Sequence, residues 1–345
     1  MFNFRKQSDR LHSREGRSRR LHCEALEERC MLAVVTVDTH LDTVDITDSY
    51  TSLREAIYAT NLVGGPDTIE FHPSLSGQTI LLTLGELAIT DSLTINGLGH
   101  DLLTIDASGN DPTPEENIGD GSRVFDIRDG RSTMSDVEIR GLTLTGGDIL
   151  GSSIRGGGAI YSRENLTLIE CMIAGNSALG SGRGGGGGGG IYADGRVSII
   201  SSNISDNFTN GNGGGAYIRD DVSVIDSEIS NNTAKFSGGG LYSVGGHLSV
   251  IDSVVSENSI EGSSREQSGG GIYSVAGSLH VVNSEILGNT VSGSEAYGGG
   301  IYANNYEEYG EENTRIINST IADNHVAGYG GGRWWHLGEL RNNPR

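Results

Sequence analysis

The sequence has few cysteines, prolines and aromatic residues, and each shortage narrows the class of protein. Three cysteines among 345 residues, Cys23, Cys30 and Cys171, cannot build a disulfide framework, and no redox compartment follows from them. Aromatic residues make up 6% and hydrophobic residues 35%, so a narrow core of small β-branched side chains is expected. With 54 glycines and five prolines, the chain is too rich in glycine to be helical throughout. Extended, tightly turned structure is therefore predicted.

Basic residues and long apolar runs are also scarce. Lys and Arg number 24 against 45 Asp and Glu, which gives a net charge of −21. So acidic a chain repels phosphate backbones, which argues against nucleic acid as a partner. Divalent cations or basic proteins are better candidates for partners. The alternative is that the excess of acidic residues only keeps a β-rich surface soluble. The longest apolar runs, such as residues 31–35 and 80–84, are too short to span a bilayer, so no integral membrane segment is expected.

Residues 1–33 form a basic, polar and aperiodic segment that lacks the apolar stretch of a secretory signal peptide. Its end reads R-R-L-H-C-E-A-L-E-E-R-C-M-L-A. This end resembles the amino-terminal element of many planctomycete surface and extracellular proteins, which is written around L-E-x-R-x-L-L-A. The resemblance implies export or a cell-surface location, with processing near Ala33. The alternative is a disordered start with an incidental Glu-Arg pattern.

Residues 34–122 are expected to cap the structure that follows. Ser52 and Glu55 have the spacing of a capping box, and apolar residues recur on one face of the helix that they would begin. Such a helix would plug the exposed amino-terminal end of a stacked solenoid. The stretch from about 35 to 106 resembles the CSLREA domain that precedes β-helix repeats in bacterial surface proteins. Thr51 stands where that family usually has cysteine, so any role of that thiol is absent here.

Residues 123–332 repeat two short elements, and this repetition is the strongest signal in the chain. The first element, G-G-A-I-Y or G-G-G-I-Y in most copies, ends at Tyr161, Tyr192, Tyr217, Tyr242, Tyr273 and Tyr302. The second, an eleven-residue element such as V-S-I-I-S-S-N-I-S-D-N, ends at Asn176, Asn207, Asn232, Asn258, Asn289 and Asn324. Lengths vary only in the two connections between these elements, as expected when strands stack in register and loops project sideways. Six coils of a solenoid are predicted.

The eleven-residue element predicts how a coil is built. It begins with alternating residues, so its first and third positions should face inward. A serine recurs in its middle, and Cys171 replaces that serine once, which indicates a buried structural thiol. The asparagines suit a turn and can hydrogen-bond to their counterparts in neighbouring coils. The glycines allow positive φ and close backbone approach at the sharpest corner.

The fold predicted is all-β, a right-handed single-stranded parallel β-helix with an amino-terminal capping helix. Its repeats resemble the polymorphic outer-membrane-protein repeats of chlamydiae, which pair G-G-A-I with F-x-x-N. Residues 157–160 match the first motif, whereas the second is I-x-x-N or V-x-x-N here. The resemblance implies an adhesin-like or structural module at the cell surface or outside the cell. Its partner would be a polysaccharide or a cell-surface component, contacted by the loops around 177–187, 259–268 and 306–313.

Parallel β-helices also include polysaccharide lyases and hydrolases, so such an enzyme is the alternative function. It would need carboxylates set apart from the repeat. Asp220 and Asp221 lie in a turn that recurs in every coil, so they are interpreted as solvated, and no catalytic residue is assigned. The insertion Y-E-E-Y-G-E-E-N is the other cluster of acidic residues. It is either a binding site or only an acidic surface loop. Its residues could bind Ca²⁺, the one cofactor considered, and stack on sugar: Glu307, Glu308, Glu311 and Glu312 for the metal, Tyr306 and Tyr309 for the sugar.

Residues 333–345 are predicted to form an irregular tail, R-W-W-H-L-G-E-L-R-N-N-P-R. Trp334 takes the position of the tyrosines, but the eleven-residue element does not return. Either the chain is a truncated member of a longer family or this tail folds back as a cap. The apolar side chains of this tail could also promote self-association.

Overall fold

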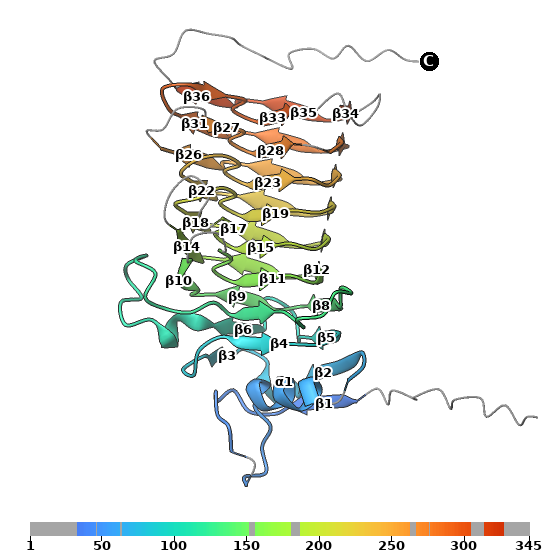
Figure 1. Ribbon diagram of the computed structural model, residues 1–345. Coiled ribbons are helices and arrows are strands. Elements are labelled where there is room, and N and C mark those ends of the chain that lie inside the picture. Colours follow the sequence, from blue (N-terminus) through green and yellow to red (C-terminus); the bar gives the residue numbers. More distant parts are fainter. Residues whose placement is uncertain are drawn as a thin grey trace, which may run out of the picture. The chain divides into compact units, whose positions relative to one another are not determined.

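The computed structural model describes residues 33–45, 47–62, 64–151, 156–180, 187–262, 267–275, 277–304 and 314–327. These residues wind through successive coils that stack on one another, from the blue coils beside helix α1 (Leu53–Leu62) to the red coil that ends in β36 (His325–Ala327) (Figure 1). All pairs of neighbouring strands in its sheets run parallel, so the predicted all-β parallel β-helix is confirmed. Among the described residues no helix is long and apolar enough to cross a membrane.

Each sheet collects one strand from successive coils. Sheet A contains β1 (Val34–Val37), β2 (Asp67–Phe71), β5 (Leu93–Asn96), β8 (Asp136–Arg140), β12 (Asn165–Ile169), β16 (Val197–Ile200), β20 (Val222–Ile225), β24 (Leu248–Ile251), β29 (Leu279–Val282) and β34 (Thr314–Ile317). Sheet B contains β3 (Gln78–Leu81), β6 (Leu103–Asp106), β9 (Thr143–Thr145), β13 (Met172–Ala174), β17 (Asn203–Ser205), β21 (Glu228–Ser230), β25 (Val254–Ser256), β30 (Glu285–Leu287) and β35 (Thr320–Ala322).

Two further long sheets and one short sheet complete the coils. Sheet C contains β4 (Leu87–Ile89), β7 (Phe125–Ile127), β11 (Ile160–Ser162), β15 (Ile191–Ala193), β19 (Ala216–Ile218), β23 (Leu241–Val244), β28 (Ile272–Val275) and β33 (Ile301–Asn304). Sheet D contains β10 (Asp148–Gly151), β14 (Ser177–Gly180), β18 (Phe208–Thr209), β22 (Thr233–Ala234), β26 (Ser259–Glu261), β31 (Thr290–Ser292) and β36. Sheet E pairs β27 (Gln267–Ser268) with β32 (Ala296–Tyr297), and two short 3-10 helices lie at Pro73–Leu75 and Ala107–Asn110.

Sheet D was not predicted. A loop was expected over the whole connection between each asparagine and the next glycines, but a short strand begins directly after the asparagine. Its second residue points into the core, as at Ala178, Thr209 and Ala234, each with no exposed surface. The strands are two to four residues long and chemically mixed, so no alternation marks them. The corners therefore insert their extra residues after sheet D rather than after the asparagine.

The eleven-residue element spans two strands and two corners. In one copy, Val197 and Ile199 of β16 face inward, and Ile204 of β17 does so on the next sheet. A residue with positive φ turns the chain at each corner, Ser201 at 47° and Asp206 at 57°. This left-handed conformation is unfavourable for most side chains but is reached most readily by Asn and Asp, and polar residues fill both corner positions in most coils.

Buried polar ladders satisfy the backbone at these corners. Each serine hydroxyl accepts the backbone N–H of the equivalent residue one coil earlier, as Ser227 does from Ser202 at 3.0 Å. From Asn207 onward, each asparagine side chain accepts the backbone N–H and the amide N–H of the asparagine one coil earlier, as Asn232 does from Asn207. Cys171, 1% exposed, occupies the serine column, and burial raises the pKa of its thiol to about 11. The predicted ladders and the structural role of Cys171 are confirmed.

The glycine elements form the sharpest corner, between sheets D and C. Gly213, the first glycine of its copy, has φ of +70°. The first glycine of each of the other five copies also has positive φ, between 58° and 80°. A Cβ on Gly214 would lie 2.2 Å from the carbonyl oxygen of Gly239 in the next coil. Glycine is therefore required both for backbone conformation and for the close approach of neighbouring coils. The predicted role of the glycines is confirmed.

Helix α1 lies at the blue end of the stack in Figure 1 and contacts β1, β2 and β4. Ser52 and Glu55 form the predicted capping box, because the Glu55 N–H donates to Ser52 Oγ and the Ser52 N–H donates to Glu55 Oε2. Leu53, Ala56 and Ile57 are buried in the continuous hydrophobic core. The amino-terminal end of the core is thus covered by the helix, as expected from the sequence.

Candidate functional site

The tyrosines of the repeat form a continuous column on the outer face of sheet C. Within each strand the flanking residues point inward, so the tyrosine between them points outward. Successive rings lie 4.6–5.5 Å apart between centroids, and four of the five pairs are stacked: Tyr161, Tyr192, Tyr217, Tyr242, Tyr273 and Tyr302. The rings cover one another's faces, and Tyr161 and Tyr192 are 1% and 2% exposed. The column therefore reaches the surface only at the half-buried tyrosines of the later coils, from Tyr217 to Tyr302. Burial raises the pKa of Tyr192 to about 12.

A row of charged residues runs beside the tyrosine column. Arg163, Asp194 and Arg219 each follow their tyrosine by two residues, and strand register places them in consecutive coils. Asp194 lies 3.9 Å from the guanidinium of Arg163 and 3.3 Å from that of Arg219. The two arginine side chains are 51% and 54% exposed, whereas Asp194 is 22% exposed. We call Arg163, Asp194 and Arg219 the charged row.

A compact acid–base cluster continues this row toward the amino terminus. Asp126 takes the tyrosine position in β7 and forms a bidentate ion pair with Arg128. Glu86 pairs with Arg123 at 2.9 Å and lies beside Asp126. Burial, and then the neighbouring Asp126 carboxylate, raise the pKa of Glu86 against the opposing effect of Arg123. Both arginines also lie over the ring of Tyr161, at 5.2 and 5.5 Å from its centroid.

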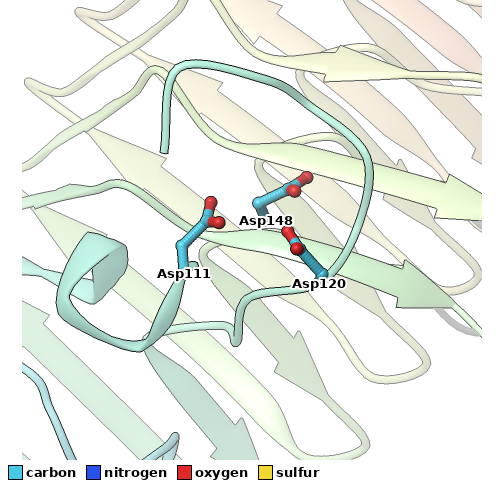
Figure 2. A group of neighbouring side chains, drawn as sticks. All are labelled: Asp111, Asp120 and Asp148. Atoms are coloured by element: carbon cyan, nitrogen blue, oxygen red, sulfur yellow. The ribbon is translucent and has the colours of Figure 1, made fainter. Parts of the chain in front are cut away.

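Three aspartates meet on the loop before sheet C and at the start of β10 (Figure 2). The carboxylate oxygens of Asp111, Asp120 and Asp148 lie within 4.8 Å of one another. Asp148 is 3% exposed and accepts hydrogen bonds from the backbone N–H groups of Ile118 and Gly119 and from the Ser177 hydroxyl. Burial and the two neighbouring carboxylates raise the pKa of Asp111. Asp148 thus holds the loop to sheet D. We therefore interpret the three aspartates as a structural contact between the loop and the sheet.

The residues predicted for calcium and sugar lie outside the described residues. These are Glu307, Glu308, Glu311 and Glu312, with Tyr306 and Tyr309. Asp220 and Asp221 lie in the turn between β19 and β20, where each accepts a backbone N–H, so the interpretation as turn residues is confirmed. Of the predicted binding loops, 177–187 and 259–268 begin with strands of sheet D.

The charged row and the Glu86 cluster were not assigned a role from the sequence. The row lies in the four-residue connection after each tyrosine, which reads as an ordinary solvated turn. The sequence did contain a signal for the row, because the second residue after each tyrosine lies on the same face of an extended strand as the tyrosine itself. Glu86 precedes the repeats by more than thirty residues, so only the fold places it beside Asp126 and Arg123.

No protein-family model matches this chain, and no curated protein or solved structure is significantly similar to it. The resemblances to the CSLREA domain, to the chlamydial repeats and to the planctomycete amino-terminal element therefore remain predictions.

Proposed function

We propose that this protein is an extracellular or cell-surface β-helix scaffold that binds an acidic polysaccharide along the outer face of sheet C. The observation that carries the proposal is the parallel course of the tyrosine column and the charged row across consecutive coils. Successive coils are about 4.8 Å apart, which is close to the length of one sugar unit in a linear polymer. The scaffold would therefore present one side chain of the charged row to each successive sugar, first Arg163, then Asp194, then Arg219.

The chemistry of the charged row favours an acidic polymer. Exposed guanidinium groups bind carboxylates through two parallel hydrogen bonds. Arg163 and Arg219 stand on either side of Asp194, which can accept hydrogen bonds from sugar hydroxyls. Tyr217, which is half-buried beside Arg219, supplies a further polar and apolar contact. The charged row holds two arginines against one aspartate, so it is locally basic in a chain whose net charge is −21.

Binding of the purified full chain to polygalacturonate tests this proposal. The double variant Arg163→Gln and Arg219→Gln should bind about tenfold more weakly or worse, since two charge-assisted contacts are lost. Arg140→Gln is the matched control, because Arg140 is a comparably exposed arginine paired with Glu138 on sheet A. Equal affinity of the double variant and the native chain would contradict the proposal.

A polysaccharide hydrolase or lyase is the second candidate, favoured by the Glu86 cluster. A carboxyl group with a raised pKa beside a second carboxyl group is the arrangement that general acid catalysis uses. Glu86 would donate the proton, and Asp126 and the two arginines would hold the substrate. Turnover of polygalacturonate that is abolished by Glu86→Gln would support this candidate. Turnover that survives Glu86→Gln but is lost in Glu307→Gln and Glu311→Gln would move the chemistry to the predicted calcium insertion.

Location outside the cell belongs to the same proposal. It is supported by the resemblance of residues 1–33 to an amino-terminal element of exported proteins and by the repeats that resemble surface adhesins. Fractionation of the cells that produce the chain, followed by detection with an antibody, tests it. Recovery only from the cytoplasm would contradict it.

A further inference from the structure

The backbone of sheet C holds the charged row in register, one side chain from each coil. The backbone N–H of Asp194 donates to the carbonyl oxygen of Ser162 at 2.9 Å, and that of Arg219 donates to the carbonyl oxygen of Ala193 at 3.0 Å. Both bonds belong to the ladder that pairs the strands of successive coils. The side chains of the row therefore follow one another at about 4.8 Å, whether or not a ligand is bound.

Within the row a carboxylate separates two exposed guanidinium groups. Arg163 and Arg219 are two coils apart, about 10 Å, which is close to the length of two sugar units in a linear polymer. Each of these arginines can bind a carboxylate of the ligand. A carboxylate on the sugar between them would lie against the like charge of Asp194, which lowers affinity. The middle position therefore favours an uncharged sugar, whose hydroxyl groups can donate hydrogen bonds to Asp194.

The coils on either side of the row continue this alternation. Strand register places Arg128 one coil before Arg163, but Asp126 holds Arg128 in a bidentate ion pair that carries no net charge. One coil after Arg219 the same position belongs to Val244, a half-buried apolar residue. Across these five coils, basic character at this position thus returns only in every second coil, at Arg163 and Arg219.

We propose that the charged row selects a linear polysaccharide in which acidic and uncharged sugars alternate, in preference to a polymer with a carboxylate on every sugar. This inference rests on the proposed binding of an acidic polysaccharide to sheet C and names the class of polymer. Two acidic sugars lie against Arg163 and Arg219, and the uncharged sugar between them lies against Asp194. The selectivity comes from Asp194, because the arginines attract both classes of polymer.

Two hexasaccharides of equal length test the proposal with the purified full chain. One comes from hyaluronan, in which glucuronate alternates with N-acetylglucosamine, and the other from polygalacturonate, in which every sugar is acidic. Isothermal titration calorimetry should show that the hyaluronan hexasaccharide binds about fivefold more tightly or better. Asp194→Asn removes the charge but keeps an acceptor for sugar hydroxyls. It should therefore strengthen binding of the oligogalacturonide more, and reduce the preference to less than about twofold.

Asp226→Asn is the matched control. Asp226 is an exposed aspartate at the corner between sheets A and B, where asparagine occurs in other coils, so the variant removes the same charge far from sheet C without altering the corner. It should leave the preference unchanged. Equal binding of the two hexasaccharides by the native chain, or a preference that persists in Asp194→Asn, would overturn this inference and leave the proposed function standing. Failure of both hexasaccharides to bind would overturn the proposed function and this inference with it.

Discussion

Single buried side chains connect the coils, and the asparagine ladder is the clearest case. Asn232 has no exposed surface, and its amide group donates to Asn258 and to the carbonyl of Ile204 while its oxygen accepts from Asn207. The ladder thereby provides partners for backbone groups that the corner takes out of the sheets. Equivalent bonds between the amide groups of successive asparagines measure 2.9–3.0 Å throughout.

Replacement of Asn232 by alanine should therefore destabilise the protein strongly. It leaves the backbone N–H of Asn207 without a partner and removes one of the two hydrogen bonds to the side-chain oxygen of Asn258, so the free energy of unfolding should fall by about 2 to 4 kcal/mol. Asn203→Ala is the control, because Asn203 points outward from β17 and its Oδ1 accepts no hydrogen bond. Urea unfolding measures both variants. A loss at Asn232 no larger than at Asn203 would show that the ladder does not hold the coils.

The tyrosine column predicts how stability responds to alkaline pH. Burial raises the pKa of Tyr192 to about 12, whereas tyrosine in an unfolded chain ionises near 10. The unfolded state therefore loses its proton first, and stability falls as pH rises from about 10 to about 12. Burial also raises the pKa values of Tyr217 and Tyr242. Tyr192→Phe should flatten this fall in unfolding experiments over that range, and an unchanged slope would contradict the assignment.

At the scale of elements, each corner imposes its own demand on the sequence. The second glycine of each triplet meets the backbone of the next coil, whereas the third meets both that backbone and the asparagine ladder at a longer distance. A Cβ would lie 2.2 Å from a carbonyl oxygen at Gly214 and 2.8 Å from one at Gly215. Alanine occurs naturally at the third position once, as Ala159, which is fully buried there.

Alanine substitutions should separate these two positions. Gly215→Ala should cost about 1 to 2 kcal/mol of unfolding free energy, since a Cβ there would lie 2.8 Å from the carbonyl oxygen of Gly240, which must shift. Gly214→Ala should cost more than about 3 kcal/mol or prevent folding, since backbone must move against backbone. Thermal unfolding of both variants provides the measurement. Equal losses, or a larger loss at Gly215, would contradict this account of the corner.

The elements also show why part of the fold was predictable and part was not. The tyrosines, asparagines and serines recur at fixed intervals because each meets its own kind in the next coil, and a repeat of that sort is visible in the sequence. Sheet D was missed because its strands are short, and their inward residues range from Ala178 to Ile260. The Glu86 cluster could not be predicted, because Glu86 and Asp126 are brought together only by the pairing of β4 with β7.

At the scale of the whole molecule, the described coils form a regular scaffold whose faces differ in chemistry. The strands of sheet B from β13 to β35, with the corners on either side of them, carry acidic residues such as Glu228 and Glu285 and no Lys, Arg or His. Sheet C instead carries Arg123, Arg128, Arg163 and Arg219 beside its tyrosines. A negatively charged polymer should therefore be repelled by one face and held by the other.

A crystal structure of the full chain with an acidic oligosaccharide, such as an oligogalacturonide, tests the central claim most directly. The account predicts the sugar chain on the outer face of sheet C, with its carboxylates against Arg163 and Arg219 and its hydroxyls near Asp194. An oligosaccharide bound over sheet A, B or D, with both arginines untouched, would contradict it.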